Sequence, residues 1–339
     1  MIELLENHPL DGLNTFGFPS VAARYAEAAN DDDLIALLKQ ADAMGLEPLI
    51  LGGGSNVVLT GDLPHFVIRL TTASVTMTDP DPNGAVQVTA DAGLDWHGFV
   101  EQTLDLGLSG LENLSLIPGT VGAAPVQNIG AYGVELDQRL SSVRAWHRPS
   151  AGWLELDAAE CAFEYRNSRF KRERGDWVIT SVTFDLGHHL AVTYGYRALA
   201  DELADHGIQN PTARDIADAV IAVRRAKLPD PAELGNAGSF FHNPVVTTAE
   251  ADAIAARFPA LVRYPQADGR VKLAAGWLID QLGFRGYTEN GVGVHDRQAL
   301  VLVNTGDGTG RALMTLAEKI TTAVAEQYGV TLTVEPLVL

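Results

Sequence analysis

The chain has 339 residues, of which 46% are hydrophobic and 20% charged, a composition typical of a soluble globular protein with two or three domains. Acidic residues outnumber basic ones by 43 to 24, so the formal net charge is −19, which argues against nucleic acid or an anionic membrane as a partner. Cys161 is the single cysteine, which excludes an intrachain disulfide and a cysteine-based zinc site.

The N-terminus lacks the features of a secretion signal. Glu3 and Glu6 stand where a signal peptide carries positive charge, and no apolar run approaches the roughly 18 residues that span a bilayer. We therefore expect a cytoplasmic protein without a membrane-inserted segment.

The first part of the chain predicts a small β-α-β-β unit. Val21–Ala28 alternates as a strand, and Pro48–Leu51 and Phe66–Leu70 are short apolar runs typical of buried strands. Between the first two strands, Asn30 is placed to cap a helix that ends at Gly45. The buried stripe expected on this helix consists of Leu34, Leu37, Leu38 and Ala41.

Two glycine-rich stretches indicate close approach of the backbone to a ligand. Gly52-Gly-Gly-Ser-Asn56 follows the second strand, and Gly110–Gly133 carries five glycines with no charged side chain between Glu112 and Glu135. The first stretch alone is typical of a tight turn, since it matches neither a G-x-G-x-x-G fingerprint nor a Walker loop. Three adjacent glycines also form a nest of N–H donors for phosphate oxygens, and glycine suits a backbone that must approach a ligand closely. Together the stretches predict one large, flat or anionic ligand.

The middle of the chain mixes strands and helices. Alternation at Val86–Ala90 predicts a strand, and the next helix carries its apolar face from Trp96 to Leu104. Antiparallel strands are expected at Ser142–Trp146, Trp153–Leu156 and Val178–Leu186. Because no regular βαβ repetition occurs, the pattern favours an α+β fold over a doubly wound sheet.

The last part begins after a proline-rich break. A helix at Ala213–Lys227 ends at Leu228-Pro-Asp-Pro231, where two prolines mark a domain boundary. Thr247 and Glu250 form a capping box that opens a helix. The remaining expected elements are helices at Gly276–Gly283 and Arg311–Tyr328 and strands at Leu300–Asn304 and Val330–Val334.

Three single residues, taken alone, do not indicate a function. Arg166 and Ser239 each fit an ordinary surface or loop position, since most arginines are solvated and no G-x-S-x-G elbow surrounds the serine. Glu335 fits a carboxylate at the end of a strand. The nine histidines form no H-x-x-x-H or H-E-x-x-H pattern, so no metal site is expected.

The motifs taken together resemble the UDP-N-acetylenolpyruvoylglucosamine reductase family, the flavoproteins of bacterial peptidoglycan precursor synthesis. The resemblance extends from Asn14 to Glu335 and follows the family's order, including its longer, first type with a tyrosine-bearing loop. Besides the two glycine stretches, the matching segments are Glu164–Ser168, Val192–Gly195, Lys227–Pro231, Gly235–Pro244, Tyr264–Gly269, Lys272–Asp280 and His295–Leu300.

This resemblance implies an α+β protein of three domains, with a two-domain FAD-binding fold of the vanillyl-alcohol-oxidase (PCMH) type and a C-terminal substrate-binding domain. Residues 1–72, joined by a C-terminal strand at about 330–339, would form the first flavin-binding subdomain. Residues 73–228 would form the second, and residues 229–329 the substrate domain. FAD would be held non-covalently between the first two domains, and the UDP-sugar between them and the third.

The implied reaction is the NADPH-dependent reduction of the enolpyruvyl ether of UDP-N-acetylglucosamine to UDP-N-acetylmuramate. NADPH would reduce FAD and leave, flavin N5 would give hydride to the vinyl C3, and C2 would be protonated. Arg166 would polarise the substrate carboxylate, Ser239 would donate the proton and Glu335 would assist the enol. Groups contacting the UDP-sugar would be Tyr194, Lys227, Asn243 and Gln298. The implied FAD-binding residues are Gly52, Gly53, Gly54, Ser55, Asn56, Pro118, Gly119, Thr120, Gly122, Ala123, Asn128, Gly130, Ala131 and Tyr132.

The C-terminus departs from the family pattern. The family usually ends Glu-Pro-Glu-Val-Arg or similarly, whereas this chain ends Thr333-Val-Glu335-Pro-Leu-Val-Leu. Counting forward from Gly329-Val330 without a gap matches Glu335 to the family's second, functional glutamate.

Two other functions are compatible with the residues. One is another FAD oxidoreductase of the same flavin-binding fold that acts on an alcohol or hydroxy acid, which would need no Ser239 loop. The other is a nucleotide-sugar binding protein without redox activity, which would purify colourless. For the reductase implied by the resemblance we expect a monomer.

Overall fold

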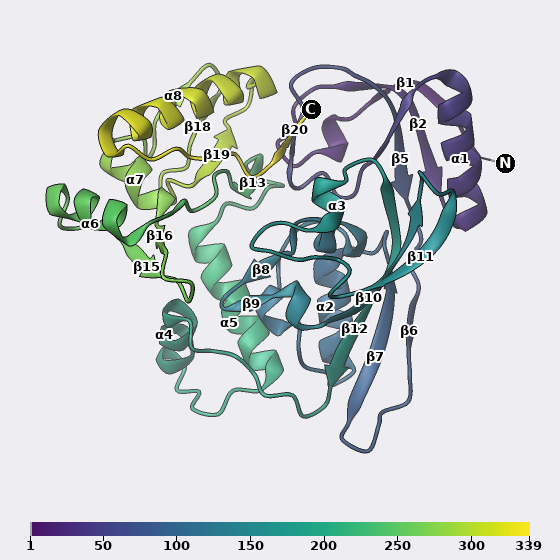
Figure 1. The fold of residues 1–339 in the computed structure, drawn as a ribbon, viewed down its shortest axis with the longest axis horizontal. Helices are drawn as coiled ribbons and strands as arrows, with labels where there is room; N and C mark the ends of the chain where they lie inside the picture. Colours follow the sequence, from purple (N-terminus) through teal and green to yellow (C-terminus); the bar gives the residue numbers. More distant parts are fainter. Residues whose placement is uncertain (1) are drawn as a thin grey trace. The chain divides into compact units, whose positions relative to one another are not determined.

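The computed structural model describes residues 2–339, and Figure 1 labels many of their helices and strands. The chain divides into two compact units. Unit 1 consists of the residues up to His8, Ala22–Gly53 and Pro64–Ala226, and unit 2 of Pro9–Val21, Gly54–Leu63 and Lys227–Leu339. The finer division into three domains stays a prediction.

The first sheet of unit 1 follows the β-α-β-β pattern expected from the sequence. Its strand order is β1 (Leu5–Pro9), β2 (Val21–Ala28), β5 (Leu63–Leu70) and β3 (Glu47–Ile50), with β3 parallel to β5. Helix α1 (Asp31–Met44) begins at Asn30, whose side chain accepts from the Asp33 N–H, and ends at Gly45 with φ of 65°. The predicted stripe of α1 is buried.

A five-stranded antiparallel sheet forms the larger part of unit 1. Its strand order is β11 (Gly152–Asp157), β10 (Leu140–His147), β12 (Trp177–Gly187), β7 (Ala85–Asp91) and β6 (Val75–Met77). The strands predicted at Ser142–Trp146, Trp153–Leu156 and Val178–Leu186 are therefore confirmed as β10, β11 and β12, each with slightly wider bounds.

Helices α2 (Trp96–Asp105) and α5 (Ala213–Lys227) belong to the same unit, with the shorter α3 (Arg169–Arg172) and α4 (Arg197–Asp205). Trp96 and Phe99 of α2 pack against Phe184 of β12, with ring centroids 5.9 and 5.4 Å from it. This aromatic cluster fixes α2 on the sheet, since large buried rings dominate core packing.

The Gly110–Gly133 stretch is folded into short pieces, as its poor helix propensity predicts. It contains the 3-10 helices η2 (Glu112–Leu114) and η3 (Val121–Gln127) and strand β8 (Gly130–Ala131). Strand β9 (Val134–Glu135) and helix η4 (Leu136–Gln138) follow at once.

Unit 2 is built on two small sheets. One has the order β13 (Asn236–Ser239), β19 (Val301–Asn304), β18 (Val292–Val294) and β17 (Thr288–Glu289), and the other β14 (Val245–Val246), β16 (Val271–Leu273) and β15 (Arg263–Pro265). Its helices are η1 (Asp11–Leu13), α6 (Thr248–Arg257), α7 (Ala275–Gln281) and α8 (Gly310–Tyr328). The predicted capping box of α6 is present.

The C-terminus differs from the sequence prediction. Val330–Val334 does not form the expected strand; an isolated bridge joins Val334 to Phe241, and a short strand β20 (Leu337–Val338) lies parallel to β4 (Val57–Val58). The apolar alternation of Val330 and Leu332 instead reflects side-chain burial in the core of unit 2.

Among residues 2–339, no helix has both the length and the apolar character needed to cross a membrane.

We expect the aromatic cluster to dominate the stability of unit 1. Phe184 is fully buried, so Phe184→Ala should lower the free energy of unfolding by about 3–5 kcal/mol through lost burial and the remaining cavity. The matched control is Leu154→Ala on the same sheet, where Leu154 is 43% exposed and the change should cost less than about 0.5 kcal/mol. Denaturant unfolding measures both, and equal losses in the two variants would contradict this assignment of the core.

Candidate active site

The two glycine-rich stretches touch each other within unit 1. A Cβ atom on Gly53 would lie 3.0 Å from the Cα of Gly119, and one on Gly52 would lie 2.7 Å from Thr120 Oγ1. A side chain on Gly53 would therefore press against the Gly119 backbone and push the two stretches apart. The structure therefore brings the two predicted cofactor-binding stretches together. Their backbones approach so closely that only glycine, which has no side chain, fits at the contact.

The second stretch is anchored at the start of α2. Gly122 donates its N–H to the Ala92 carbonyl at 3.0 Å, and the Trp96 N–H donates to Gly119 at 3.0 Å. A Cβ on Gly122 would meet the Ala92 Cβ at 2.5 Å. Residues Pro118–Ala123 are thus held against the turn before α2, so this backbone is already ordered for a ligand.

The first loop continues into unit 2. Gly54 has φ of +62°, and a Cβ there would collide with the Leu13 carbonyl oxygen. The Gly54 carbonyl accepts from the Thr15 N–H at 3.1 Å, and the Asn56 carbonyl accepts from the Leu337 N–H at 2.9 Å. Ser55 and Asn56 therefore follow Gly54, whose left-handed backbone conformation only glycine readily adopts. They lead directly into strand β4.

Arg166 is tied to the second glycine stretch. Its Nη1 donates to the Asn128 carbonyl at 3.2 Å and its Nη2 to the Gly130 carbonyl at 2.6 Å. The backbone of Arg166 has φ of 55°, a left-handed conformation that is costly for a residue with a side chain and is concentrated at functional sites. These two hydrogen bonds tie the Arg166 guanidinium to the second glycine stretch.

Arg224 is a residue that the sequence analysis missed. Its Nε atom is shielded from solvent and has no hydrogen-bond partner within residues 2–339. Burial lowers the pKa of Arg224. The nearby Tyr132 partly offsets this shift, whereas the positive charge of Arg166 lowers the pKa of Arg224 further. Burial also raises the pKa of Tyr132, which Arg224 partly offsets. Two guanidinium groups and a tyrosine thus share one region of unit 1.

The helical pattern contained a signal for Arg224. It follows Ile216 and Val220 at intervals of four residues, and both of these are buried in α5. A charged side chain in line with a buried stripe is unusual unless it has a ligand or a charged partner.

Asn128 and Tyr132 have protein partners of their own. The Asn128 side chain is fully buried, donates to Glu135 and the Glu164 carbonyl, and accepts from the Asp137 N–H. A cofactor contact of Asn128 would therefore use its backbone. The ring of Tyr132 packs edge-on against Tyr196 at 5.4 Å.

Asn113 links the glycine stretch to the segment that carries Tyr194. Its side-chain amide donates to the carbonyls of Tyr132 at 3.2 Å and Thr193 at 2.8 Å. Tyr194 itself is 41% exposed, so a ligand can reach its ring. Asn113 is buried and is not accessible to a ligand.

Ser239 is presented by a bulge in unit 2. The register of β13 against β19 shifts between Asn236 and Ser239, and Gly238, with φ of +68°, donates its N–H to Asn236 Oδ1 at 2.8 Å. Bulges re-aim side chains at functional sites. Here the result is an exposed Ser239 directly before the buried Phe240 and Phe241.

Glu335 is held by the backbone on both sides. Its N–H donates to the Phe240 carbonyl at 2.9 Å, and two residues later the Leu337 N–H donates to Asn56. The side chain of Glu335 is 12% exposed, with its Oε2 3.4 Å from His242 Nδ1. Unit 2 therefore brings Glu335 to the segment that carries Ser239 and to the end of the first glycine loop.

Asn243 and Gln298 each lie beside the first turn of α7. Asn243 Oδ1 accepts from the Ala275 N–H at 2.9 Å, and Gln298 Oε1 lies 3.2 Å from the Cβ position of Gly276. Lys227 is an exposed residue at the end of α5. Arg166 and Tyr194 belong to unit 1, whereas Ser239, Asn243, Gln298 and Glu335 belong to unit 2.

Other features of the described chain bear on alternative chemistries. Burial raises the pKa of Cys161 to about 12, so it is not an activated nucleophile. No group of three or more His, Cys, Asp or Glu side chains in residues 2–339 is placed to hold a metal ion.

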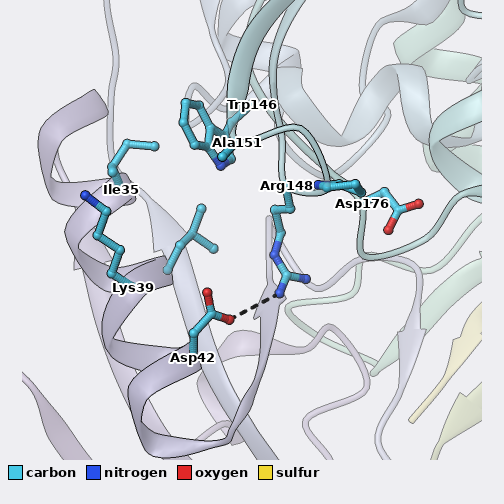
Figure 2. Close-up of a pocket in the computed structure, with 9 residues that line it drawn as sticks. Ile35, Lys39, Asp42, Trp146, Arg148, Ala151 and Asp176 are labelled. Carbon is cyan, nitrogen blue, oxygen red and sulfur yellow. Dashed lines mark ion pairs between the residues drawn. The ribbon is translucent and has the colours of Figure 1, made fainter.

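A groove of about 340 Å³ lies between α1 and the turn joining β10 to β11 (Figure 2). Its lining includes the apolar side chains of Trp146 and Ile35 and the charged side chain of Lys39. Arg148 and Asp42, which also line it, form an ion pair at 3.6 Å. None of the predicted site residues lines this groove.

Comparison with known proteins identifies the family. Residues 22–150 match a family model described as FAD binding domain, and residues 230–339 match the C-terminal domain of UDP-N-acetylenolpyruvoylglucosamine reductase. The reductase of that name from Ralstonia nicotianae is 52% identical over 99% of both chains. The chain belongs to the UDP-N-acetylenolpyruvoylglucosamine reductase family. Its Cupriavidus pinatubonensis relative is 51% identical over the full length of both chains.

Solved structures confirm the fold. The family member from Thermus caldophilus matches 100% of this chain and 98% of its own with a TM-score of 0.67 at 22% identity. A solvent-stable cholesterol oxidase matches 98% of this chain and 87% of its own with a TM-score of 0.53 at 12% identity. The predicted α+β class, with a vanillyl-alcohol-oxidase-type flavin fold and a family-specific C-terminal domain, is confirmed. FAD is the cofactor of this family member.

The contact between the glycine loops predicts the behaviour of Gly53→Ala. The added methyl group would meet the Gly119 backbone and separate the loops, so the purified variant should retain much less FAD while keeping its secondary structure. Gly12→Ala is the matched control, because nothing lies within 4 Å of its Cβ position. Flavin absorbance relative to protein absorbance measures occupancy. Full occupancy in Gly53→Ala would show that the loop contact is not needed for FAD binding.

Proposed function

We propose that this protein uses NADPH and FAD to reduce the enolpyruvyl ether of UDP-N-acetylglucosamine to UDP-N-acetylmuramate, a step in peptidoglycan precursor synthesis. Full-length similarity to reductases of this family supports the reaction. The observation that carries the residue assignment is the bulge that exposes Ser239 beside the backbone of Glu335. Use of NADPH is consistent with the cytoplasmic location expected from the sequence.

The cofactor-binding residues fit FAD. Gly52 and Gly53 have no side chains to cover their backbone N–H groups, which can therefore donate to diphosphate oxygens. Gly122, whose N–H is donated to the Ala92 carbonyl, holds the second stretch in place. When bound, FAD supplies the hydride that it has received from NADPH. In this proposal the glycine loops bind and orient the cofactor and take no part in proton transfer.

Arg166 is proposed to stabilise the negative charge that develops on the substrate carboxylate. Hydride addition at the vinyl C3 leaves electron density on C2 and the adjacent carboxylate, and a fixed cation stabilises such charge strongly in a site shielded from water. The carbonyls of Asn128 and Gly130 hold the guanidinium in place. Arg224 adds positive charge to the same region of unit 1.

Ser239 is proposed to give its hydroxyl proton to C2. A serine hydroxyl is a weak acid, but the enolate-like carbon is strongly basic, so the transfer is chemically reasonable. The bulge at Gly238 orients Ser239 away from the buried phenylalanines that follow it. Glu335 is proposed to assist the enol by hydrogen bonding, which it can do as a donor while its carboxyl group carries a proton.

The UDP-sugar is proposed to contact Tyr194, Lys227, Asn243 and Gln298. The exposed ring of Tyr194 offers a surface for stacking or a hydroxyl for a phosphate oxygen. Lys227 offers a positive charge to the diphosphate. Asn243 and Gln298 are amides held at the first turn of α7, a placement suited to hydrogen bonds with sugar or uracil groups.

Isotope labelling of the product tests the reaction. The purified protein is incubated with NADPH and the UDP-enolpyruvyl sugar in D₂O, and the product is analysed by mass spectrometry and NMR. We expect UDP-N-acetylmuramate with one solvent deuterium at C2. Failure to oxidise NADPH in the presence of this sugar, or deuterium at C3 alone, would contradict the proposal.

Ser239→Ala separates the two halves of the reaction. Loss of the proton donor should slow reoxidation of the reduced flavin by the sugar by about 10²-fold or more, the usual contribution of a positioned acid. Reduction of the flavin by NADPH should be unchanged. Ser150→Ala, an exposed loop serine, is the matched control. Stopped-flow flavin absorbance measures both halves, and equal slowing of both would indicate a structural serine.

A further inference from the structure

The segment Ala191–Gly195, which carries Tyr194, has little to fix its conformation. It forms no helix or strand, and four of its five residues are exposed. Among the hydrogen bonds of residues 2–339, the one that reaches this segment comes from the Asn113 side chain, which donates to the Thr193 carbonyl at 2.8 Å. A segment with few buried contacts and few hydrogen bonds opens at low free energy. Its conformation therefore depends strongly on Asn113.

Asn113 lies in η2 and is itself held firmly. Its side chain is 1% exposed, and its amide nitrogen donates to the Tyr132 carbonyl at 3.2 Å as well as to Thr193. An asparagine side chain has two N–H donors, which matches the two carbonyls. A buried polar group whose donors have partners specifies one arrangement of the chain around it. The amide thus joins Thr193 to the end of the second glycine stretch.

Weaker contacts place the residues on both sides of Tyr194 at the same end of the glycine stretch. A Cβ atom on Gly133 would lie 3.8 Å from Thr193 Cγ2, and the ring of Tyr196 packs edge-on against Tyr132 at 5.4 Å. Methyl and ring contacts of this kind are less directional than a hydrogen bond. The bond from Asn113 is therefore the contact that fixes the backbone directly before Tyr194.

We propose that Asn113 is a positioning residue that places Tyr194 for the UDP-sugar by holding the Thr193 carbonyl. The inference rests on the proposed function of Tyr194 for its effect on sugar binding, but not for the tether itself. Asn113 is buried and touches neither the sugar nor the flavin in this account. The second bond of its amide, to Tyr132, makes the glycine stretch the fixed support of the Tyr194 segment.

The first test observes the tether without the sugar. Chymotrypsin cleaves after tyrosine, and Tyr194 and Tyr196 are both exposed. Asn113→Leu keeps the size of the side chain and removes its donors, so the holoenzyme of this variant should be cut at these tyrosines faster than the wild type. The matched control is Thr103→Val, which removes a buried hydroxyl that donates to the Val100 carbonyl in α2 and should not change the rate. Equal rates in Asn113→Leu and the wild type would overturn the proposal.

The second test asks whether Asn113 acts through Tyr194. Calorimetry measures binding of the UDP-enolpyruvyl sugar to the oxidised holoenzyme, which has no hydride to transfer. We expect Asn113→Leu to weaken binding about tenfold, because a ligand binds more weakly when only a fraction of the protein has the competent conformation. In the Tyr194→Ala background the same change should have little effect, since the effects of residues that act as one unit do not add.

The same loss of sugar binding in both backgrounds would overturn the positioning role. Loss of FAD from Asn113→Leu and from the smaller change Asn113→Ser would also overturn it, since Asn113 would then support the flavin site itself. If Tyr194→Ala binds the sugar as tightly as the wild type, the proposed function of Tyr194 is contradicted instead. The cleavage rates would still decide whether Asn113 holds the segment.

Discussion

The organisation of the cofactor site depends on the contact between two glycine backbones. Gly53 approaches Gly119 so closely that one methyl group would reach the opposite Cα at 3.0 Å. The second stretch is in turn bonded to Ala92 and Trp96 at the start of α2, and Trp96 packs in the aromatic core. The aromatic core thereby holds in place the backbone that we propose binds the FAD diphosphate. Arg166 depends on the same stretch, because its guanidinium is held by the carbonyls of Asn128 and Gly130.

The proposed catalytic groups of unit 2, Ser239 and Glu335, depend on a second constraint, the pairing of the chain end. Glu335 is bonded through its backbone to Phe240, and Leu337 is bonded to Asn56. The last residues therefore join the Ser239 segment to the end of the first glycine loop. Glu335 and its neighbour His242 owe their contact to this pairing, since neither residue lies in a regular helix or strand. The same pairing supports the gap-free register that matches Glu335 to the functional glutamate of the family.

Local patterns in the sequence predicted much of the fold. The caps and buried stripe of α1, the helix α8 and the strands β10, β11 and β12 agree with the structure, because each is determined by local sequence signals such as the periodicity of neighbouring residues. Val330–Val334 was predicted wrongly because its alternation reflects burial without a paired strand. Arg224 lies in line with the buried stripe of α5, but its charged and polar neighbours Arg166 and Tyr132 are distant in sequence and could not be found from local pattern. The roles of the site residues rest on motif resemblance and stay proposals.

The central claim is that one protein binds FAD on its glycine loops and directs the reducing equivalents to an enolpyruvyl ether. Anaerobic reduction of the purified protein with NADPH, followed by addition of the UDP-enolpyruvyl sugar, tests it most directly. We expect NADPH to bleach the flavin absorbance and the sugar to restore it, with one UDP-N-acetylmuramate formed per flavin reoxidised. A flavin that remains reduced after the sugar is added would contradict the account.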